Sequence, residues 1–217
     1  MLKKLSDEKI VEILETGISE FAVHGLDRAN INVIAKKSGV SVGVLYKYYS
    51  DKEAFFLACL KHSLETLRSV ISDAVSGEGK LLERAEKLIR AVQWTSREHS
   101  VYNIMYNEIT AGASQKYAKH LAEQIEGISS QVYIEFISEA SASGEIRSDI
   151  DPRMFAFFFD NLLLTLQFSY SCDYYRERFK IFCGEDILDD DEKVVSELLK
   201  FIESAFTFSQ TEITHKG

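Results

Sequence analysis

The chain has 217 residues, of which 46% are hydrophobic and 27% charged, as in an ordinary soluble protein with a sizeable core. Its three cysteines are odd in number and far apart, which argues against a disulfide framework and for a reducing cytoplasm. With no secretion signal and no apolar run long enough to cross a membrane, we expect a cytoplasmic protein without a membrane partner.

The first predicted helix covers residues 6–24. Its apolar residues recur at helical spacing and form one stripe: Ile10, Ile13, Leu14, Gly17, Ile18, Phe21 and Ala22. Ser6 can cap this helix, and Asp7 and Glu8 suit the positive end of its dipole. We expect the stripe to cover the next two helices and to complete a three-helix head.

Residues 30–52 are expected to form two short helices joined by a tight turn. Asn30 can cap the first helix and Ser41 the second. Gly39 follows the first helix, where a left-handed backbone conformation is needed. Two helices can cross closely where a small residue is followed four residues later by Gly and six residues after that by an apolar residue. This spacing occurs at Ala35, Gly39 and Leu45. The pattern predicts a helix-turn-helix of the DNA-binding kind.

The charge of this segment is opposite to that of the whole chain, which carries −9. Between residues 28 and 52 there are five basic residues and one acidic residue, a net charge of +4: Arg28, Lys36, Lys37, Lys47, Lys52 and Asp51. A local patch can hold phosphates while the acidic remainder limits indiscriminate binding. The alternative is that these are ordinary solvated charges.

A long helix is expected to follow, extending to about residue 75. The run 50–53 has the form of a capping box, with Ser50 at the cap and Glu53 three residues later. Free backbone N–H groups at this helix start, with Lys52 beside them, favour an anion such as a DNA phosphate. The alternative is that Lys52 is simply an exposed lysine.

At this point the sequence resembles the TetR (tetracycline-repressor-like) family of bacterial regulators. The resemblance covers about the first sixty residues and is carried by Ile10, Ile13, Phe21, Gly25, Ile34, Ala35, Gly39, Val40, Ser41, Gly43, Leu45, Tyr46, Tyr49, Lys52 and Glu53. Two positions depart from it. Val42 stands where relatives often carry a basic or polar residue, and Tyr49 stands where Phe is usual.

The resemblance implies a helix-turn-helix DNA-binding domain over residues 1–50 and a helical ligand-binding and dimerisation domain over residues 51–217. The expected DNA-binding residues are Asn30, Ser41, Val42, Gly43, Val44, Tyr46, Lys47, Tyr48 and Lys52. Tyr46 and Lys47 would contact base edges or flanking phosphates, and Gly43 would let the helix backbone approach DNA closely. Asn30, Tyr48 and Lys52 would hold the phosphate backbone, with Ser41 helping at the helix start.

The rest of the chain is also predicted to be helical, which gives an all-α fold of about nine helices. The later helices are expected over residues 80–98, 101–111, 115–141, 151–182 and 189–206. Asp151 can cap one of them, with Pro152 at its first position.

An unusually apolar helix, residues 154–166, predicts a homodimer. It is apolar nearly all round, so both of its faces need cover. We expect a second copy to cover one face, together with the last helix, in a two-fold four-helix interface. The family's usual dimer through its last two long helices agrees with this. The alternative is a fully buried core helix in a monomer.

The resemblance also implies a pocket for a small, mostly apolar effector in the middle helices. Its candidate residues are Trp94, Tyr102, Met105, Tyr106, Glu108, Tyr117, His120 and Asp160. Aromatic residues at helical spacing are more often plain core. Glu108 and Asp160 stand out as acids in apolar surroundings. Either could orient a ligand's cation or hydroxyl, or could be hydrogen-bonded across the interface.

We therefore predict a homodimeric transcription factor, a repressor that binds a palindromic operator in double-stranded DNA. An effector would release the protein from DNA by tilting the long fourth helix, which shifts the population toward a state with lower operator affinity. No cofactor, metal site or catalytic residue is expected, because no phosphate-binding glycine loop, nucleophile elbow or paired Glu-x-x-His motif occurs. The rival interpretations are an enzyme in the C-terminal domain and a helical interaction module that no longer binds DNA.

Overall fold

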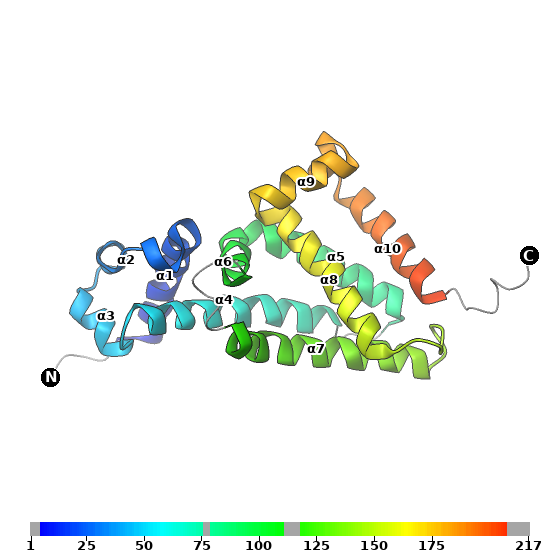
Figure 1. Ribbon diagram of the computed structural model, residues 1–217, viewed down its shortest axis with the longest axis horizontal. Helices are drawn as coiled ribbons and strands as arrows, with labels where there is room; N and C mark the ends of the chain where they lie inside the picture. The colour runs from blue at the N-terminus through cyan, green and yellow to red at the C-terminus, as the bar shows by residue number, and fades with distance from the viewer. Residues whose placement is uncertain (1–4, 76–78, 111–117, 208–217) are drawn as a thin grey trace, which may run out of the picture. The chain divides into compact units, whose positions relative to one another are not determined.

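The computed structural model describes residues 5–75, 79–110 and 118–207, and this part of the chain is helical without strands (Figure 1). It contains ten α-helices and one short 3-10 helix. The all-α prediction is confirmed. None of the described helices is both long and apolar enough to cross a membrane. The chain divides into two compact units, which are described separately.

Unit 1 comprises residues Met1–Leu67 and Val101–His120. It holds the helices α1 (Asp7–Arg28), α2 (Ile31–Lys37) and α3 (Val42–Tyr48), the first part of α4 (Lys52–Val75), and α6 (Ser100–Thr110) except its first residue. The predicted domain boundary after residue 50 stays a prediction. The head packs with the start of α4 in one compact unit.

Most of the apolar stripe of α1 is buried, as its spacing predicted, and Ile10 and Ala22 at its two ends are half-buried. Phe21 is fully buried, and its ring centroid lies 5.1 Å from that of Phe56 and 5.8 Å from that of Phe55 on α4. Gly17 makes this close approach possible, because a Cβ there would lie 2.6 Å from both Cys59 Sγ and the Phe55 ring. The helix is longer than predicted and ends at Arg28, with a break at Gly25, where φ is 66°.

The predicted helix caps are confirmed at three starts in unit 1 and wrong at the fourth. Ser6, Asn30 and Ser41 each accept a backbone N–H of their own helix. At α4 the cap is Asp51 rather than Ser50, since Asp51 Oδ1 accepts the N–H of Ala54 at 2.7 Å. Ser50 instead donates its hydroxyl to Asp51 at 3.2 Å. A charged carboxylate one position later outcompetes the hydroxyl as acceptor.

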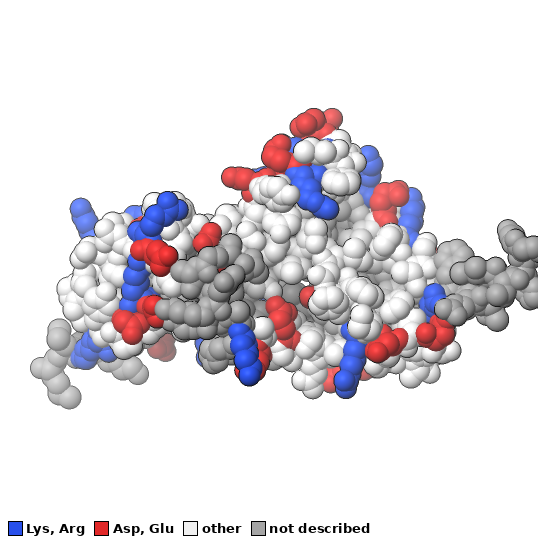
Figure 2. Space-filling model, viewed as in Figure 1, with Lys and Arg blue, Asp and Glu red and all other residues white. Residues whose placement is uncertain are grey.

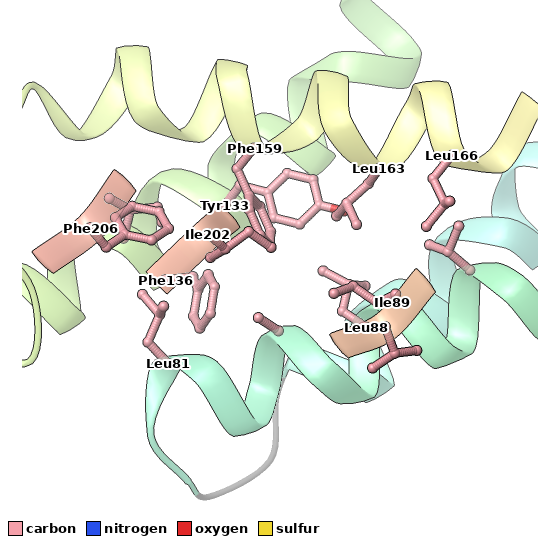
Figure 3. Packing of buried hydrophobic residues seen from close by; sticks show 14 of the residues in the cluster. Leu81, Leu88, Ile89, Tyr133, Phe136, Phe159, Leu163, Leu166, Ile202 and Phe206 are labelled. Atoms are coloured by element: carbon pink, nitrogen blue, oxygen red, sulfur yellow. The ribbon is translucent and has the colours of Figure 1, made fainter. Parts of the chain in front are cut away.

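Unit 2 comprises residues Arg68–Ser100 and Leu121–Gly217. Beyond the end of α4 it holds α5 (Leu81–Glu98), α7 (Ala118–Ala142) apart from its first residues, α8 (Pro152–Ser171), α9 (Asp173–Cys183), the 3-10 helix η2 (Glu185–Asp189) and α10 (Asp191–Thr207). Its core joins side chains from α5, α7, α8 and α10 (Figure 3). The predicted cap at Asp151 and the proline at the start of α8 are confirmed.

The helix predicted over residues 151–182 is two helices, which is why the described residues hold ten α-helices instead of nine. The chain is extended at Cys172, with φ −109° and ψ 127°, and α9 starts at the next residue. Just before this break, Ser169 and Ser171 donate their hydroxyls to carbonyls four residues back, at 2.8 and 2.5 Å. Such bonds compete with the helical pattern and favour its end here.

Candidate DNA-binding surface and effector site

Unit 1 holds α3 on α2 in the arrangement that the sequence predicted. Asn30 Oδ1 accepts the N–H of Asn32 at 2.9 Å, and Ser41 Oγ accepts that of Val44 at 3.3 Å. Between the two helices Gly39 has a φ of 64°, the left-handed conformation that favours glycine. Leu45, only 1% exposed, anchors α3 to the core. The opposite face of α3 is thereby turned outward.

The outward face of α3 carries an aromatic and a basic side chain. Tyr46 is 42% exposed and Lys47 is exposed. Within the described residues neither side chain makes a hydrogen bond or an ion pair, so both can contact a ligand. Gly43 is exposed beside them, while Val42 and Val44 are half-buried.

Two residues predicted to hold the DNA backbone are already engaged within unit 1. The hydroxyl of Tyr48 accepts the N–H of Leu5 at 2.7 Å. Lys52 Nζ donates to the carbonyl oxygen of Asp27 at 2.8 Å. An ammonium group has three donors, so this bond leaves Lys52 able to contact a phosphate. Its position is held by α1 as well as by α4.

Basic residues surround the helix-turn-helix, and we name Arg28, Lys36, Lys37 and Lys47 the basic rim. All four side chains are exposed, and Figure 2 shows Lys and Arg side chains over the part of unit 1 that carries α2 and α3. Lys37 lies 3.6 Å from the carboxylate of Glu20, so its charge is partly offset. The rim can supply phosphate contacts.

Glu20 is a positioning residue that the sequence interpretation missed. It is 6% exposed, and its Oε1 accepts the N–H of Asn30 at 3.2 Å, which secures the entry into α2. His24 and Lys37 lie 3.7 and 3.6 Å from its carboxylate. A signal was present, since Glu20 lies three residues after Gly17 at the edge of the apolar stripe.

The predicted effector residues fall into two groups. Tyr102, Met105, Tyr106 and Glu108 lie on α6 in unit 1, whereas Trp94 and Asp160 belong to unit 2. Tyr117 and the side chain of His120 lie outside the described residues. The role of every one of these residues in ligand binding stays a prediction.

In unit 1 the predicted effector residues contact the head. Tyr102, 4% exposed, donates its hydroxyl to Glu15 Oε1, which also lies 3.0 Å from His62 Nε2. The side chain of Glu108 reaches the break in α1, since a Cβ on Gly25 would lie 3.1 Å from its Oε2. Met105 is fully buried. Tyr102 and Glu108 are thus engaged with α1.

In unit 2 the two candidates differ in burial. Trp94 is 56% exposed, with its ring 6.1 Å from that of His99. Asp160 is half-buried on α8, and the resulting loss of hydration, followed by the nearby charge of Glu126, raises the pKa of its carboxyl from 3.8 to about 6. The negative charge of Asp160 therefore disfavours the folded state.

Replacing Asp160 by Asn is expected to stabilise the protein at pH 7.5 by on the order of 1–2 kcal/mol, and not at pH 4. A raised carboxyl pKa favours the folded state at low pH, and that advantage is lost as the pH rises from about 4 to about 6. Urea unfolding at the two pH values measures the difference. Glu135→Gln, at an exposed acid on α7, is the control. An equal gain at both pH values would refute the prediction.

A helix-turn-helix, an exposed second helix and a basic rim are the features by which helix-turn-helix DNA-binding proteins are recognised. Residues 13–59 match the family model described as bacterial regulatory proteins, tetR family. This N-terminal segment of the chain is therefore similar to the TetR family.

Similarity extends to individual known proteins. The chain is 23% identical over 146 residues to the "Probable acrEF/envCD operon repressor" of Escherichia coli K12, an alignment covering 64% of this chain and 66% of the relative, just under two thirds.

Two solved structures share the fold. FadR of Bacillus subtilis in complex with stearoyl-CoA is 17% identical with a TM-score of 0.69, over 88% of this chain and 97% of that one. The regulator CifR in complex with 26-bp operator DNA is 16% identical with a TM-score of 0.69, over 92% and 98%.

Proposed function

We propose that this protein is a sequence-specific DNA-binding transcriptional regulator that represses genes from a palindromic operator. The observation that carries the proposal is the α3 face, where Tyr46 and Lys47 are exposed and uncommitted on a family-matched helix-turn-helix. The similar fold of CifR, whose structure contains operator DNA, supports it. Relatives such as the Escherichia coli repressor are regulators, and we propose no enzymatic activity.

In this proposal α3 enters the major groove. Tyr46 and Lys47 contact base edges or adjacent phosphates, and Gly43 lets the backbone come close. The half-buried Val42 and Val44 complete the surface. The residues proposed to contact the phosphate backbone are Asn30, Ser41, Tyr48 and Lys52.

The side chains of Asn30 and Ser41 already cap helices, and this limits the hydrogen bonds that they can make to DNA. Each uses an oxygen to accept a backbone N–H. The amide N–H groups of Asn30 and the hydroxyl hydrogen of Ser41 are still donors that a phosphate can accept.

Replacing Lys52 by Ala is expected to weaken binding to all duplexes alike, because a phosphate contact carries no sequence information. The slope of log affinity against log salt should become shallower by about one, the loss of one neutralised phosphate. Fluorescence anisotropy with a selected duplex and a scrambled duplex, each at several salt concentrations, measures both effects. An unchanged slope would remove Lys52 from the phosphate contacts.

Lys61→Ala is the matched control for this experiment, since Lys61 lies on the same helix and is exposed beside Glu65. Its salt slope should equal that of the unmodified protein. The same titration tests the alternative function. A helical interaction module without DNA binding would show no duplex affinity even at low salt.

We further propose that the regulator is a homodimer acting in the cytoplasm. Support comes from unit 2, where α8 exposes Met154, Phe157 and Phe158 to between 49 and 61% and α10 exposes Phe201 to 59%. A second copy covering these side chains would remove the apolar surface from water. Two α3 helices about 34–36 Å apart would then read successive major grooves. The mass in solution, measured by light scattering, tests the dimer.

A small effector is proposed to release the operator by favouring a state with lower DNA affinity, reached by a tilt of α4. Support comes from FadR of Bacillus subtilis, which has a similar fold and is seen with stearoyl-CoA. Within unit 2 the residues proposed for effector contact are Trp94 and Asp160, and the candidates on α6 belong to unit 1. If an effector that released DNA left the spacing of the two heads unchanged, the tilt would be refuted.

A further inference from the structure

Helix α9 turns an apolar face outward from unit 2. None of its residues is buried, and the side chains of Tyr174, Ile181 and Phe182 are 75, 80 and 75% exposed. With Arg178 these residues recur at i, i+4, i+7 and i+8, so all four lie on one side of the helix. We name Tyr174, Arg178, Ile181 and Phe182 the α9 stripe. Water is an unfavourable surrounding for so much apolar surface.

The other side of α9 holds the helix in place on α8. The ring centroid of Tyr175 lies 5.2 Å from that of Phe168, and Phe179 packs 6.5 Å from Tyr170 by the same measure. The stripe is therefore presented on a helix that is fixed to unit 2.

The α9 stripe continues the surface through which we propose that the chain dimerises. Phe168 follows Met154 by 14 residues, close to four helical turns, so both lie on the same side of α8. From Phe168 the ring contacts lead through Tyr175 to Tyr174, whose centroid is 5.5 Å from that of Tyr175. Figure 1 shows that α9 also connects α8 to α10, the second helix with an exposed apolar side chain on that surface. A second copy that covers α8 would thus extend to α9.

The charges beside the stripe suit a second copy of the chain. The guanidinium of Arg178 lies 5.0 Å from the ring centroid of Phe182, and it forms no ion pair within the described residues. Glu185 follows three residues after Phe182 and is also exposed without an ion pair in that part of the chain. Figure 2 shows both signs of charge over α9 and η2. An anionic lipid surface would be repelled by Glu185 and Asp186, whereas a second copy supplies one arginine for each Glu185.

We propose that the α9 stripe packs against the α9 stripe of a second copy, with Arg178 of each copy facing Glu185 of the other. Contact between the two stripes removes their apolar side chains from water. A surface that carries both the arginine and its counter-charge is self-complementary, as a two-fold interface requires. The reciprocal charge pairs would disfavour pairing with a chain that lacks them. This assignment rests on the proposed homodimer and adds α9 to its interface.

A double variant, Ile181→Ser with Phe182→Ser, tests the apolar contact. Sedimentation velocity over a range of concentrations should show a dimer weakened about tenfold or more. If dilution does not dissociate the unmodified dimer, the rate of subunit exchange is compared instead and should rise by a similar factor. Val23→Ser, at a 71% exposed apolar side chain on α1, is the control and should change neither quantity. Circular dichroism checks that each variant is folded.

Mixing two charge variants tests whether the pairing is between copies. Arg178→Glu and Glu185→Arg should each weaken the homodimer about threefold or more, because like charges then face each other. In a heterodimer of the two variants both pairs are again of opposite sign. Native mass spectrometry with one variant isotopically labelled should therefore find more heterodimer than random pairing gives.

Unchanged dissociation and exchange in the double variant, or random pairing of the two charge variants, would overturn the assignment. A dimeric unmodified protein would in those cases leave the homodimer proposal standing, whereas a monomer at every concentration would overturn that proposal itself. Binding to phosphatidylglycerol vesicles that the double variant abolishes, with its dimer unchanged, would assign the stripe to a lipid surface and overturn the role of the second copy.

Discussion

Replacing Gly17 by Val is expected to lower the free energy of unfolding by about 3 kcal/mol or more. A Cβ at this position would lie 2.6 Å from Cys59 Sγ and 2.6 Å from the ring of Phe55, distances that real Cβ atoms do not reach. Both neighbours are fully buried, so neither can move aside without disturbing the core between α1 and α4. Urea unfolding followed by circular dichroism measures the loss.

Gly127→Val is the matched control, because Gly127 is an exposed helical glycine on α7 with no atom within 4 Å of an added Cβ. Its stability should change by no more than about 0.5 kcal/mol. Adding Cys59→Ala to Gly17→Val should recover part of the loss, since one of the two clashes is removed. Equal stability of the Gly17 and Gly127 variants would show that α1 and α4 can separate at little cost.

Replacing Gly43 by Leu is expected to reduce DNA affinity about 100-fold or more while leaving the fold intact. Gly43 is exposed, and the nearest atom to an added Cβ is Ser41 Oγ at 3.9 Å, so the side chain meets no obstacle within the protein. Leu favours a helix more than Gly by up to about 1 kcal/mol. The DNA affinity would fall because the leucine side chain would hold α3 away from the major groove and weaken the neighbouring contacts.

Two measurements separate the effects of this substitution. Thermal unfolding should show an unchanged or higher midpoint, and anisotropy with selected duplex DNA should show the affinity loss. Gly127→Leu, the same change on α7, should leave DNA binding unaltered. Wild-type affinity in Gly43→Leu would mean that the α3 backbone does not approach DNA, and the proposed docking would have to be abandoned.

The features predicted from sequence are those decided by neighbours in the chain. The caps at Asn30 and Ser41 and the turn at Gly39 depend on bonds and backbone angles within a few residues, and all three are confirmed. The buried face of α1 follows from helical spacing alone. The similarity to the TetR family lies in the same short segment.

The features that the sequence did not reveal depend on contacts between residues far apart in the chain, or on competition between neighbouring residues for the same structural role. The bond from Asn30 to Glu20 and that from Tyr102 to Glu15 join residues on different helices. The break at Cys172 lies within an apolar pattern that continues through it. The residues that would contact DNA or an effector stay predictions, because recognition depends on the shape of the partner as well as on this chain.

The bond from Lys52 to the carbonyl of Asp27 bears on the kinetics of DNA recognition. A free lysine gives up rotational freedom when it grips a phosphate, at a cost of up to about 2 kcal/mol. The bond to Asp27 orders the Lys52 side chain during folding, so less rotational freedom is lost when it binds a phosphate. In the proposed complex with DNA, the Lys52 ammonium group would therefore be in position before binding. The complex should dissociate more slowly than one in which the lysine side chain rotates freely before binding.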